Sequence, residues 1–161
     1  MTLRLLTIGG YGFDEHSFME ALQNAEVDTF IDVRQRRGLR GSQYAFLNSA
    51  RLQDSLRRTG IRYIHIRELA PTTRIRELQR VYDSDEAVAK RQRIRLSPLF
   101  VEAYRREVLV PFTTSSFEAT IGPTSNAVVL FCVEMEPGAC HRSLAAEHLA
   151  PAGTTVEHLM P

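Results

Sequence analysis

The stretch from Asn126 to Leu149 constrains the fold more than any other part of this 161-residue chain. It opens with an unbroken apolar run, Ala127 to Val133, that is rich in β-branched residues. Such a run is typical of a strand covered on both faces, as in a parallel sheet. A loop with Pro137 and Gly138 follows, and Cys140 then opens a predicted helix. Because open α/β sheets build their sites at the carboxyl ends of strands, the pattern predicts a site at this turn.

The rest of the chain alternates between predicted strands and helices. The other strands are predicted at Leu3 to Ile8, Thr29 to Val33, Ile61 to Ile66 and Thr154 to Leu159. Helices are predicted from an Asp14 cap to about Ala25, from an Asn48 cap through Ser49 to Thr59, from Thr72 or Thr73 to about Arg95, and from Leu99 to Val110. Residues 112 to 125 hold no clear signal beyond turn formers. This order predicts a single-domain, three-layer α/β/α fold with a mostly parallel sheet of about five strands.

Length and composition place the chain among ordinary globular proteins. A length of 161 residues is enough for one domain, residues 1–161, with a substantial core. No apolar run approaches the length of a membrane span, and the N-terminus leads directly into a strand rather than a signal peptide. We therefore expect a cytoplasmic protein with no membrane partner. Two cysteines do not make a disulfide framework.

The net charge of +1 hides a division along the chain. The segment from Arg34 to Arg95 holds 16 basic and 6 acidic residues, and 19 of the 20 basic residues of the chain are arginines. The guanidinium fork matches phosphate and stacks on bases, so this segment suggests a phosphate-bearing small molecule or a nucleic acid as partner. The alternative is that these arginines form solvated helix faces.

Two glycine-containing loops follow the first two predicted strands. The first, from Gly9 to Gly12, is able to cradle a phosphate, and Gly9 and Tyr11 are candidate substrate-binding residues. The dinucleotide fingerprint is incomplete, however, because Glu15 stands where its third glycine belongs. Tight-turn geometry is the alternative explanation. The second loop, from Gln35 to Gly41, is basic and suggests an anion clamp.

Asp32, Arg34 and His65 are candidate site residues on the second and third predicted strands. Strand alternation places Asp32 and Arg34 on one face, opposite Val33. An aspartate in an apolar strand is costly unless it is paired or functional. It is therefore either a structural ion pair with Arg34 or a carboxylate at the same edge of the sheet as Cys140. His65 either lines the site or is a hydrogen-bonded core histidine.

Cys140, His141 and Arg142 stand at the predicted start of a helix. The helix dipole and Arg142 both favour a Cys140 thiolate, which suggests nucleophilic catalysis beside His141. The adjacent placement counts against a simple pair, because neighbouring helix residues point in different directions. In a second interpretation the helix start binds an anion together with Arg142 and Arg34, and Glu134 and Asp32 act as general base or bind a sugar hydroxyl. In a third, the motif only fastens the helix to the sheet.

The sequence identifies neither a metal site nor a cofactor. Cys140, His141, His65 and His158 offer suitable ligand atoms, but no paired short spacing of the zinc type is present. Cys132 lies in the apolar run and is interpreted as packing.

Six short motifs occur in order along the chain: Thr7-Ile8-Gly9, Asp32-Val33-Arg34, Tyr63 with His65, the Leu-Phe-Cys-Val-Glu run ending at Glu134, Cys140-His141-Arg142 and Val156-Glu157-His158-Leu159. In these motifs the chain resembles, nearly from end to end, a known family catalogued as domain of unknown function 488. The resemblance implies an α/β domain with these motifs around one pocket, and it implies no reaction. Two loops depart from the family pattern. Gln35-Arg36-Arg37-Gly38 replaces a proline and serine, and Leu69-Ala70-Pro71 replaces a Leu-Gly-Gly turn.

Two classes of function follow from these features. One is an enzyme that acts on a nucleotide, nucleic acid or other phosphorylated substrate in a pocket at the carboxyl edge of the sheet. Its candidate catalytic residues are Cys140, Glu134 and Asp32, and its candidate substrate-binding residues are Gly9, Tyr11, Arg34, His65, His141 and Arg142. The other is a non-catalytic nucleic-acid or nucleotide binding module.

Overall fold

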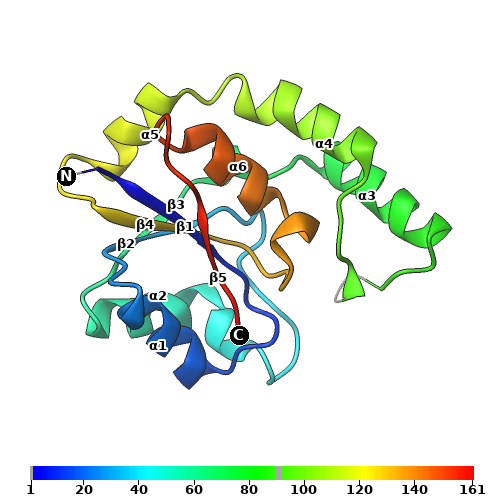
Figure 1. Ribbon diagram of the computed structural model, residues 1–161. Helices are drawn as coiled ribbons and strands as arrows, with labels where there is room; N and C mark the ends of the chain where they lie inside the picture. Colours follow the sequence, from blue (N-terminus) through cyan, green and yellow to red (C-terminus); the bar gives the residue numbers. More distant parts are fainter. Residues whose placement is uncertain (1, 90–91) are drawn as a thin grey trace.

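The computed structural model describes residues 2–89 and 92–161, and its strands form one sheet in which all neighbours are parallel. The order across the sheet is β3-β2-β4-β1-β5 (Figure 1). The strands are β1 (Arg4–Ile8), β2 (Thr29–Asp32), β3 (Arg62–His65), β4 (Ala127–Phe131) and β5 (Glu157–Leu159). The predicted fold class and the predicted strands are confirmed, each strand lying within its predicted bounds.

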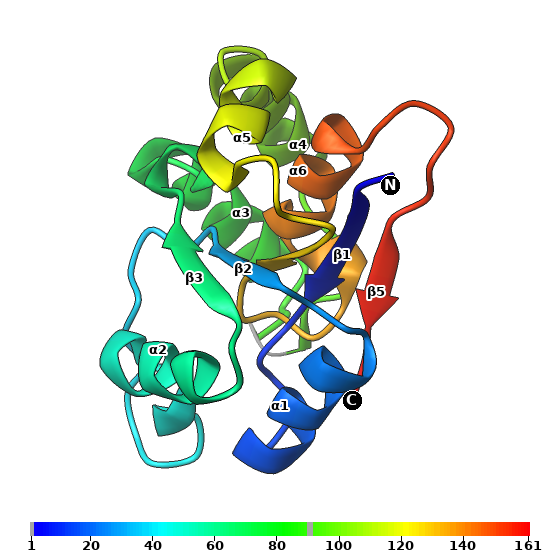
Figure 2. The same ribbon diagram turned by 90° about the vertical axis from the view of Figure 1, so that its left-hand side faces the viewer.

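Helices cover both faces of the sheet (Figure 2). One face carries α1 (Glu15–Asn24) and α2 (Ser49–Arg58), and the other carries α3 (Thr73–Asp85), α4 (Pro98–Tyr104), α5 (Thr114–Ile121) and α6 (His141–Leu149). Within residues 2–89 and 92–161, short helical segments also connect or extend these elements: η1 (Ala45–Leu47), η2 (Arg67–Leu69), the π-helical η4 (Arg105–Leu109) and η5 (Pro137–Ala139). Among the described residues, no helix combines the length and the apolar character that crossing a bilayer requires.

The centre of the sheet is the apolar run from which the fold was predicted. All of β4 is buried between its neighbours β2 and β1, as expected for a strand covered on both faces. On the side of α1, the wholly buried ring of Phe18 meets the rings of Phe30 and Phe131 edge-on, with centroids 6.2 and 5.7 Å away. Such aromatic contacts fix the angle at which α1 packs on the sheet.

Asp14 and Asn48, the two predicted caps, both stand at N-cap positions, and Thr72 begins the charged helix as a third. Asp14 accepts a hydrogen bond from the Ser17 backbone amide at 2.8 Å, and Ser17 Oγ accepts one from the Asp14 amide at 3.1 Å. Thr72 caps α3 by accepting from the Ile75 amide at 3.3 Å. Asn48 stands at the N-cap position of α2, but its side chain accepts a hydrogen bond from the Leu39 amide at 2.6 Å and makes no cap bond. The predicted position of Asn48 is therefore confirmed, but its side chain does not make the expected cap bond.

One helix prediction between residues 73 and 125 is wrong, and one helix in this range was not predicted. The charged helix ends at Asp85 rather than near Arg95, because the chain turns there through Ala87, whose φ is 53°. The amides of Ala87 and Val88 donate to the carbonyls of Ser84 and Asp83, the Schellman pattern that a glycine usually closes. Residues 90–91, which the prediction included, lie outside the described residues. Helix α5 was not predicted.

Candidate functional site

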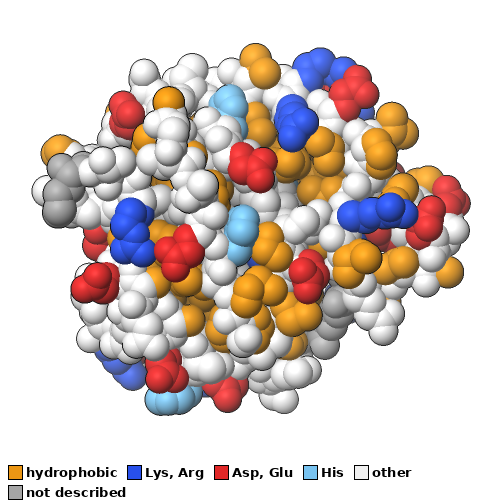
Figure 3. Space-filling model, viewed as in Figure 1, with side chains coloured by type: hydrophobic (Ala, Val, Ile, Leu, Met, Phe, Trp, Pro, Cys, Tyr) orange, Lys and Arg blue, Asp and Glu red, His pale blue; other side chains and the backbone are white. Residues whose placement is uncertain are grey.

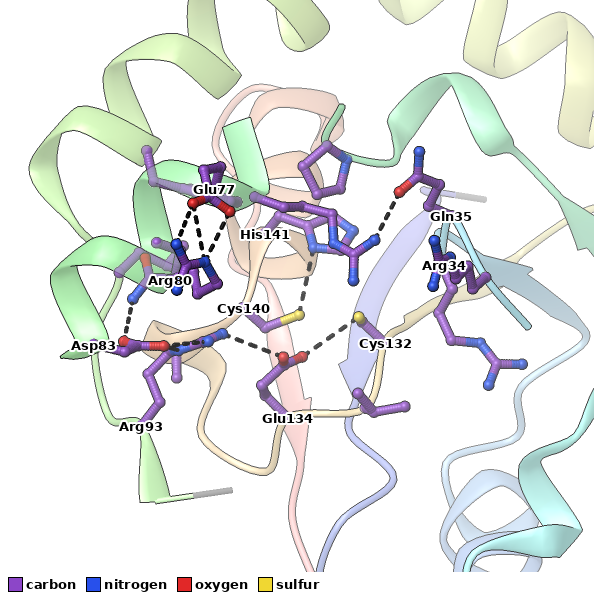
Figure 4. Close-up of a pocket in the computed structure, with 18 of the residues that line it drawn as sticks. Arg34, Gln35, Glu77, Arg80, Asp83, Arg93, Cys132, Glu134, Cys140 and His141 are labelled. Carbon is purple, nitrogen blue, oxygen red and sulfur yellow. Dashed lines mark hydrogen bonds and ion pairs between the residues drawn. The ribbon is translucent and has the colours of Figure 1, made fainter. Parts of the chain in front are cut away.

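A cavity of about 700 Å³ lies at the carboxyl ends of β2 and β4, where the sequence placed the site (Figure 4). Its walls are the 34–39 loop after β2, the inner face of α3 with residues of the segment that follows it to Phe100, and the chain from residue 132 to the start of α6. The cavity is therefore formed by segments that are far apart in the sequence.

The floor of the cavity holds two thiols, an imidazole and a carboxylate: Cys132, Cys140, His141 and Glu134. Cys140 Sγ lies 3.8 Å from His141 Nδ1, and Cys132 Sγ lies 3.5 Å from Glu134 Oε2. Cys132 directly follows the buried strand β4, and the loop through η5 returns the chain so that Cys140 faces it. Cys132 was interpreted as packing, but it lines the cavity.

Cys140 and His141 meet although they are neighbours in the sequence. Cys140 is the N-cap residue of α6 and has an extended backbone, with φ −137° and ψ 143°, so only His141 is helical. The expectation that the two side chains diverge assumed that both were in the helix, and it is wrong for this reason. His141 Nε2 lies 2.9 Å from the Val33 carbonyl, and the ring packs edge-on against Tyr104 at 5.5 Å.

The surroundings of the two thiols shift their pKa values in opposite directions. Burial alone raises the pKa of Cys140, but the hydrogen bond with Cys132 and the positive charges of His141 and Arg142 bring it well below its ordinary value. The hydrogen bond with Cys140 and burial raise the pKa of Cys132 well above its ordinary value. Burial lowers the pKa of His141, but the charge of Cys140 and its hydrogen bond, together with the Val33 carbonyl and the charge of Glu134, raise it above its ordinary value. Cys140 is therefore the thiol that ionises first.

An ion-pair chain ties α3 to the floor. Arg93 lies 3.3 Å from Glu134 Oε1 and donates through Nε to Asp83 at 2.9 Å, and Gln79 donates to Asp83 at 2.7 Å (Figure 4). The sequence predicted a solvent-exposed charged helix here, yet Gln79 and Asp83 are buried. Arg93 and Asp83 were missed because ten residues and a change of direction separate them, so no helical spacing relates them.

Arginines also stand at the rim of the cavity. Arg36 on the loop after β2 and Arg76 on α3 are both exposed, and Arg76 donates to the Gln35 amide oxygen at 2.7 Å. Arg80 also borders the cavity, but it is paired with Glu77. The basic loop suggested as an anion clamp thus forms one side of the rim, and α3 forms the other.

Asp32 and Arg34 are paired with each other rather than gathered with Cys140. Asp32 is wholly buried and does not line the cavity. Its carboxylate accepts from Arg34 Nε and Nη2 at 3.0 and 2.9 Å and from the Tyr63 hydroxyl at 2.7 Å. Arg34 borders the cavity, but its guanidinium also donates to the Leu47 carbonyl and lies 4.7 Å over the Phe131 ring. Of the two interpretations of Asp32, the observed contacts are those of a structural ion pair.

The Tyr63 hydroxyl, which donates a hydrogen bond to Asp32, has a raised pKa. Burial, and then the charge of Asp32, raise the pKa of Tyr63 to about 12. Tyr63 therefore remains a hydrogen-bond donor to Asp32 across the physiological pH range.

Arg142 and Gly9 shape the loop that carries Glu134. Arg142 is wholly buried, and its guanidinium donates to the carbonyls of Glu134 and Met135 at 2.5 and 3.1 Å. A Cβ on Gly9 would lie 2.1 Å from the Glu134 carbonyl oxygen, so only glycine allows this approach. Neither residue lines the cavity.

The remaining candidate residues, Tyr11 and His65, also lie outside the cavity lining. The Tyr11 ring packs against Tyr44 with centroids 5.0 Å apart, and His65 Nε2 lies 2.8 Å from the Arg34 carbonyl. The structure thus brings Glu134, Cys140 and His141 together around one cavity, with Arg34 at its border.

The fold and the cavity define an open, all-parallel α/β protein with a site built from polar side chains at the carboxyl edge of its sheet. The chain belongs to the family described as Domain of unknown function DUF488, whose model matches residues 15–149. The matched span includes every residue of the cavity floor, and it confirms the resemblance seen in the sequence. No curated protein and no solved structure gives a significant match to the chain.

Proposed function

We propose that the chain is an enzyme that acts on a small phosphate-bearing substrate, such as a nucleotide, bound in this cavity. One observation carries the proposal: a single cavity has exposed arginines at its rim and a thiol–imidazole–carboxylate cluster at its floor. Its volume of about 700 Å³ lies within the ordinary range for small-molecule sites, roughly 300–1,000 Å³.

The rim supplies the phosphate recognition. Arg36 borders the cavity from the loop after β2 and Arg76 from α3, and the hydrogen bond that Arg76 donates to the Gln35 amide oxygen orients its guanidinium. Planar guanidinium groups bind phosphate oxygens through paired, charge-assisted hydrogen bonds. A phosphate held at the rim leaves the rest of the substrate free to extend towards the floor.

The floor supplies the reacting groups. Cys140 and His141 stand side by side, and Glu134 faces the same space, held by Arg93. A carboxylate fixed in this way is positioned to accept or return a proton during the reaction. Substrate would displace water from a site whose thiols are already almost wholly buried.

The distribution of arginines supports a cavity-sized ligand over a long polyanion. Helices α2 and α3 carry much of the basic segment, but they lie on opposite faces of the sheet. Arg57 and Arg58 of α2 are paired with Asp54. Figure 3 shows basic and acidic side chains interspersed over the face in view. The non-catalytic nucleic-acid module is therefore the less favoured alternative.

The test is calorimetric binding of nucleoside mono- and diphosphates and of sugar phosphates, followed by product analysis. We expect R36A and R76A each to weaken binding at least about tenfold, because a hydrogen bond to a charged group contributes roughly 1.5–3 kcal/mol. R57A on α2 is the matched control and should bind like the wild type. C140A should abolish turnover.

Two results would overturn the proposal. The first is that no phosphate-bearing compound binds the wild type. The second is that R57A weakens binding as much as R76A, which would show a general charge effect rather than a clamp.

A further inference from the structure

We infer that Cys132, Cys140 and His141 form a binding site for a divalent metal of the zinc class, with a fourth position open to the cavity. Their ligand atoms, two Sγ and one Nδ1, all lie within 4.8 Å of one another. The assignment goes beyond the proposed function, and it rests on that function only for what would occupy the open position.

The separations are close to those that zinc requires. Zinc bonds of about 2.3 Å to sulfur and about 2.0–2.1 Å to nitrogen, at tetrahedral angles, place S and N about 3.6 Å apart. The observed Cys140 Sγ to His141 Nδ1 distance is 3.8 Å. No two of the three ligand atoms are more than 4.8 Å apart, so side-chain movements of up to about 1 Å would complete the geometry. Two thiolates and an imidazole are ligands that zinc prefers and that magnesium and calcium do not.

His141 is already oriented as a metal ligand. Its Nε2 lies 2.9 Å from the Val33 carbonyl oxygen. Because a carbonyl oxygen only accepts hydrogen bonds, Nε2 must carry the hydrogen. In the neutral ring this leaves the lone pair on Nδ1, which faces Cys140. Metal-binding histidines characteristically donate a hydrogen bond from their second ring N–H to a carbonyl or carboxylate in this way.

The charges around the cluster also balance. Binding of one Zn²⁺ releases two protons, one from Cys132 and one from the Cys140–His141 pair, and the resulting pair of thiolates neutralises the ion. A neutral centre is compatible with side chains that are only 2 and 7% exposed, those of Cys140 and Cys132. Glu134, whose Oε2 lies 3.5 Å from Cys132 Sγ, stands where it would accept a proton from a water at the fourth position.

The sequence did not reveal this site because its ligands lack a short paired spacing. Cys132 is the first residue of the loop after β4, and Cys140 is its last residue before α6. The fold of this loop therefore brings the two cysteines together. The assignment makes Cys140 a metal ligand in place of the nucleophile that the sequence suggested. When bound, the metal would polarise a water or a substrate oxygen at the open position.

The test is metal binding by the full chain, without substrate. Reduced protein freed of metal by a chelator is titrated with Zn²⁺ and, separately, with Co²⁺. We expect one equivalent of tightly bound metal per chain and a sulfur-to-cobalt charge-transfer band in the near ultraviolet. C132S and H141A should each weaken zinc binding by more than about tenfold, since even partners of metal ligands contribute 10- to 100-fold. H148Q, at an exposed histidine of the same helix, is the matched control.

Circular dichroism would establish that each variant is folded, and the wild-type cobalt spectrum stands independently of the variants. The assignment is overturned if the wild type binds no metal tightly, if its cobalt complex lacks the charge-transfer band, or if H148Q weakens binding as much as H141A. R36A and R76A should bind metal normally, so failure of the phosphate clamp and failure of the metal site give different results.

Discussion

Arg142 and Gly9 show how single residues determine the shape of the cavity without lining it. Arg142 joins the start of α6 to two carbonyls of the loop after β4, and Gly9 allows β1 to approach the same loop. The sequence singled out both as substrate-binding residues, because motif position does not distinguish contact with a ligand from support of the loop that contacts it. The alternation of side chains along the second strand correctly predicted that Asp32 and Arg34 share a face. It could not show that they would bind each other away from Cys140.

Replacement of Arg142 by methionine should lower the free energy of unfolding by about 2–5 kcal/mol, because it removes the hydrogen bonds that the buried guanidinium donates to two loop carbonyls. Urea denaturation provides the measurement. R106M, at an exposed arginine paired with Glu102, is the control and should change stability by less than about 0.5 kcal/mol. Equal losses in the two variants would contradict the role given to Arg142.

Replacement of Gly9 by alanine should cost about 1–3 kcal/mol, because the added Cβ would overlap the Glu134 carbonyl oxygen and displace the loop. Gly38 is the matched control, since the nearest atom to its added Cβ would be Asn48 Oδ1 at 4.0 Å. Thermal unfolding of both variants measures the difference. A G9A protein as stable as G38A would show that the loop moves freely.

At the scale of elements, the strands were easier to predict than the ends of the helices. The run through β4 has a composition that suits a strand buried on both faces, so it identified the centre of the sheet. Helix α3 was extended too far because Ala87, not glycine, adopts the left-handed conformation at its end. Helix α5 was missed because threonine and serine fill its first turn and only Phe117 and Ile121 are buried.

Asp14, the N-cap residue of α1, should make the stability of the folded chain depend on pH. The backbone hydrogen bond from Ser17, followed by its side-chain bond, lowers the pKa of Asp14 below the ordinary value of 3.8. A carboxyl group whose pKa is lower in the folded state stabilises it above the unfolded pKa, and this stabilisation is lost as the pH falls. The melting temperature of D14A should therefore lie below that of the wild type near pH 7, and the gap should narrow near pH 3. E118A, at an exposed position of α5, is the control, and a gap for D14A that does not change with pH would contradict the cap.

Across the whole molecule, the charge pattern in the sequence does not become one basic surface. The arginine-rich segment passes through α2, β3 and α3, and so it is divided between both faces of the sheet. Many of its arginines have acidic partners, such as Arg51 with Glu15 and Arg74 with Glu107. A count along the sequence could not reveal this division, because it depends on which face each helix covers.

Binding of duplex DNA should therefore be weak and strongly reduced by salt, as expected for contacts with phosphates alone. Fluorescence anisotropy across a salt series measures it, with R57A and R76A compared directly. Tight binding at physiological salt that R57A abolishes would support a nucleic-acid surface on α2 instead of the cavity.

A crystal structure of the chain with the tightest-binding nucleotide would test whether the cavity between α3 and the β4–α6 loop holds a phosphate-bearing ligand. We expect phosphate oxygens between Arg36 and Arg76, with the remainder of the ligand directed towards Cys140. A nucleotide bound elsewhere, with these two arginines untouched, would contradict this expectation.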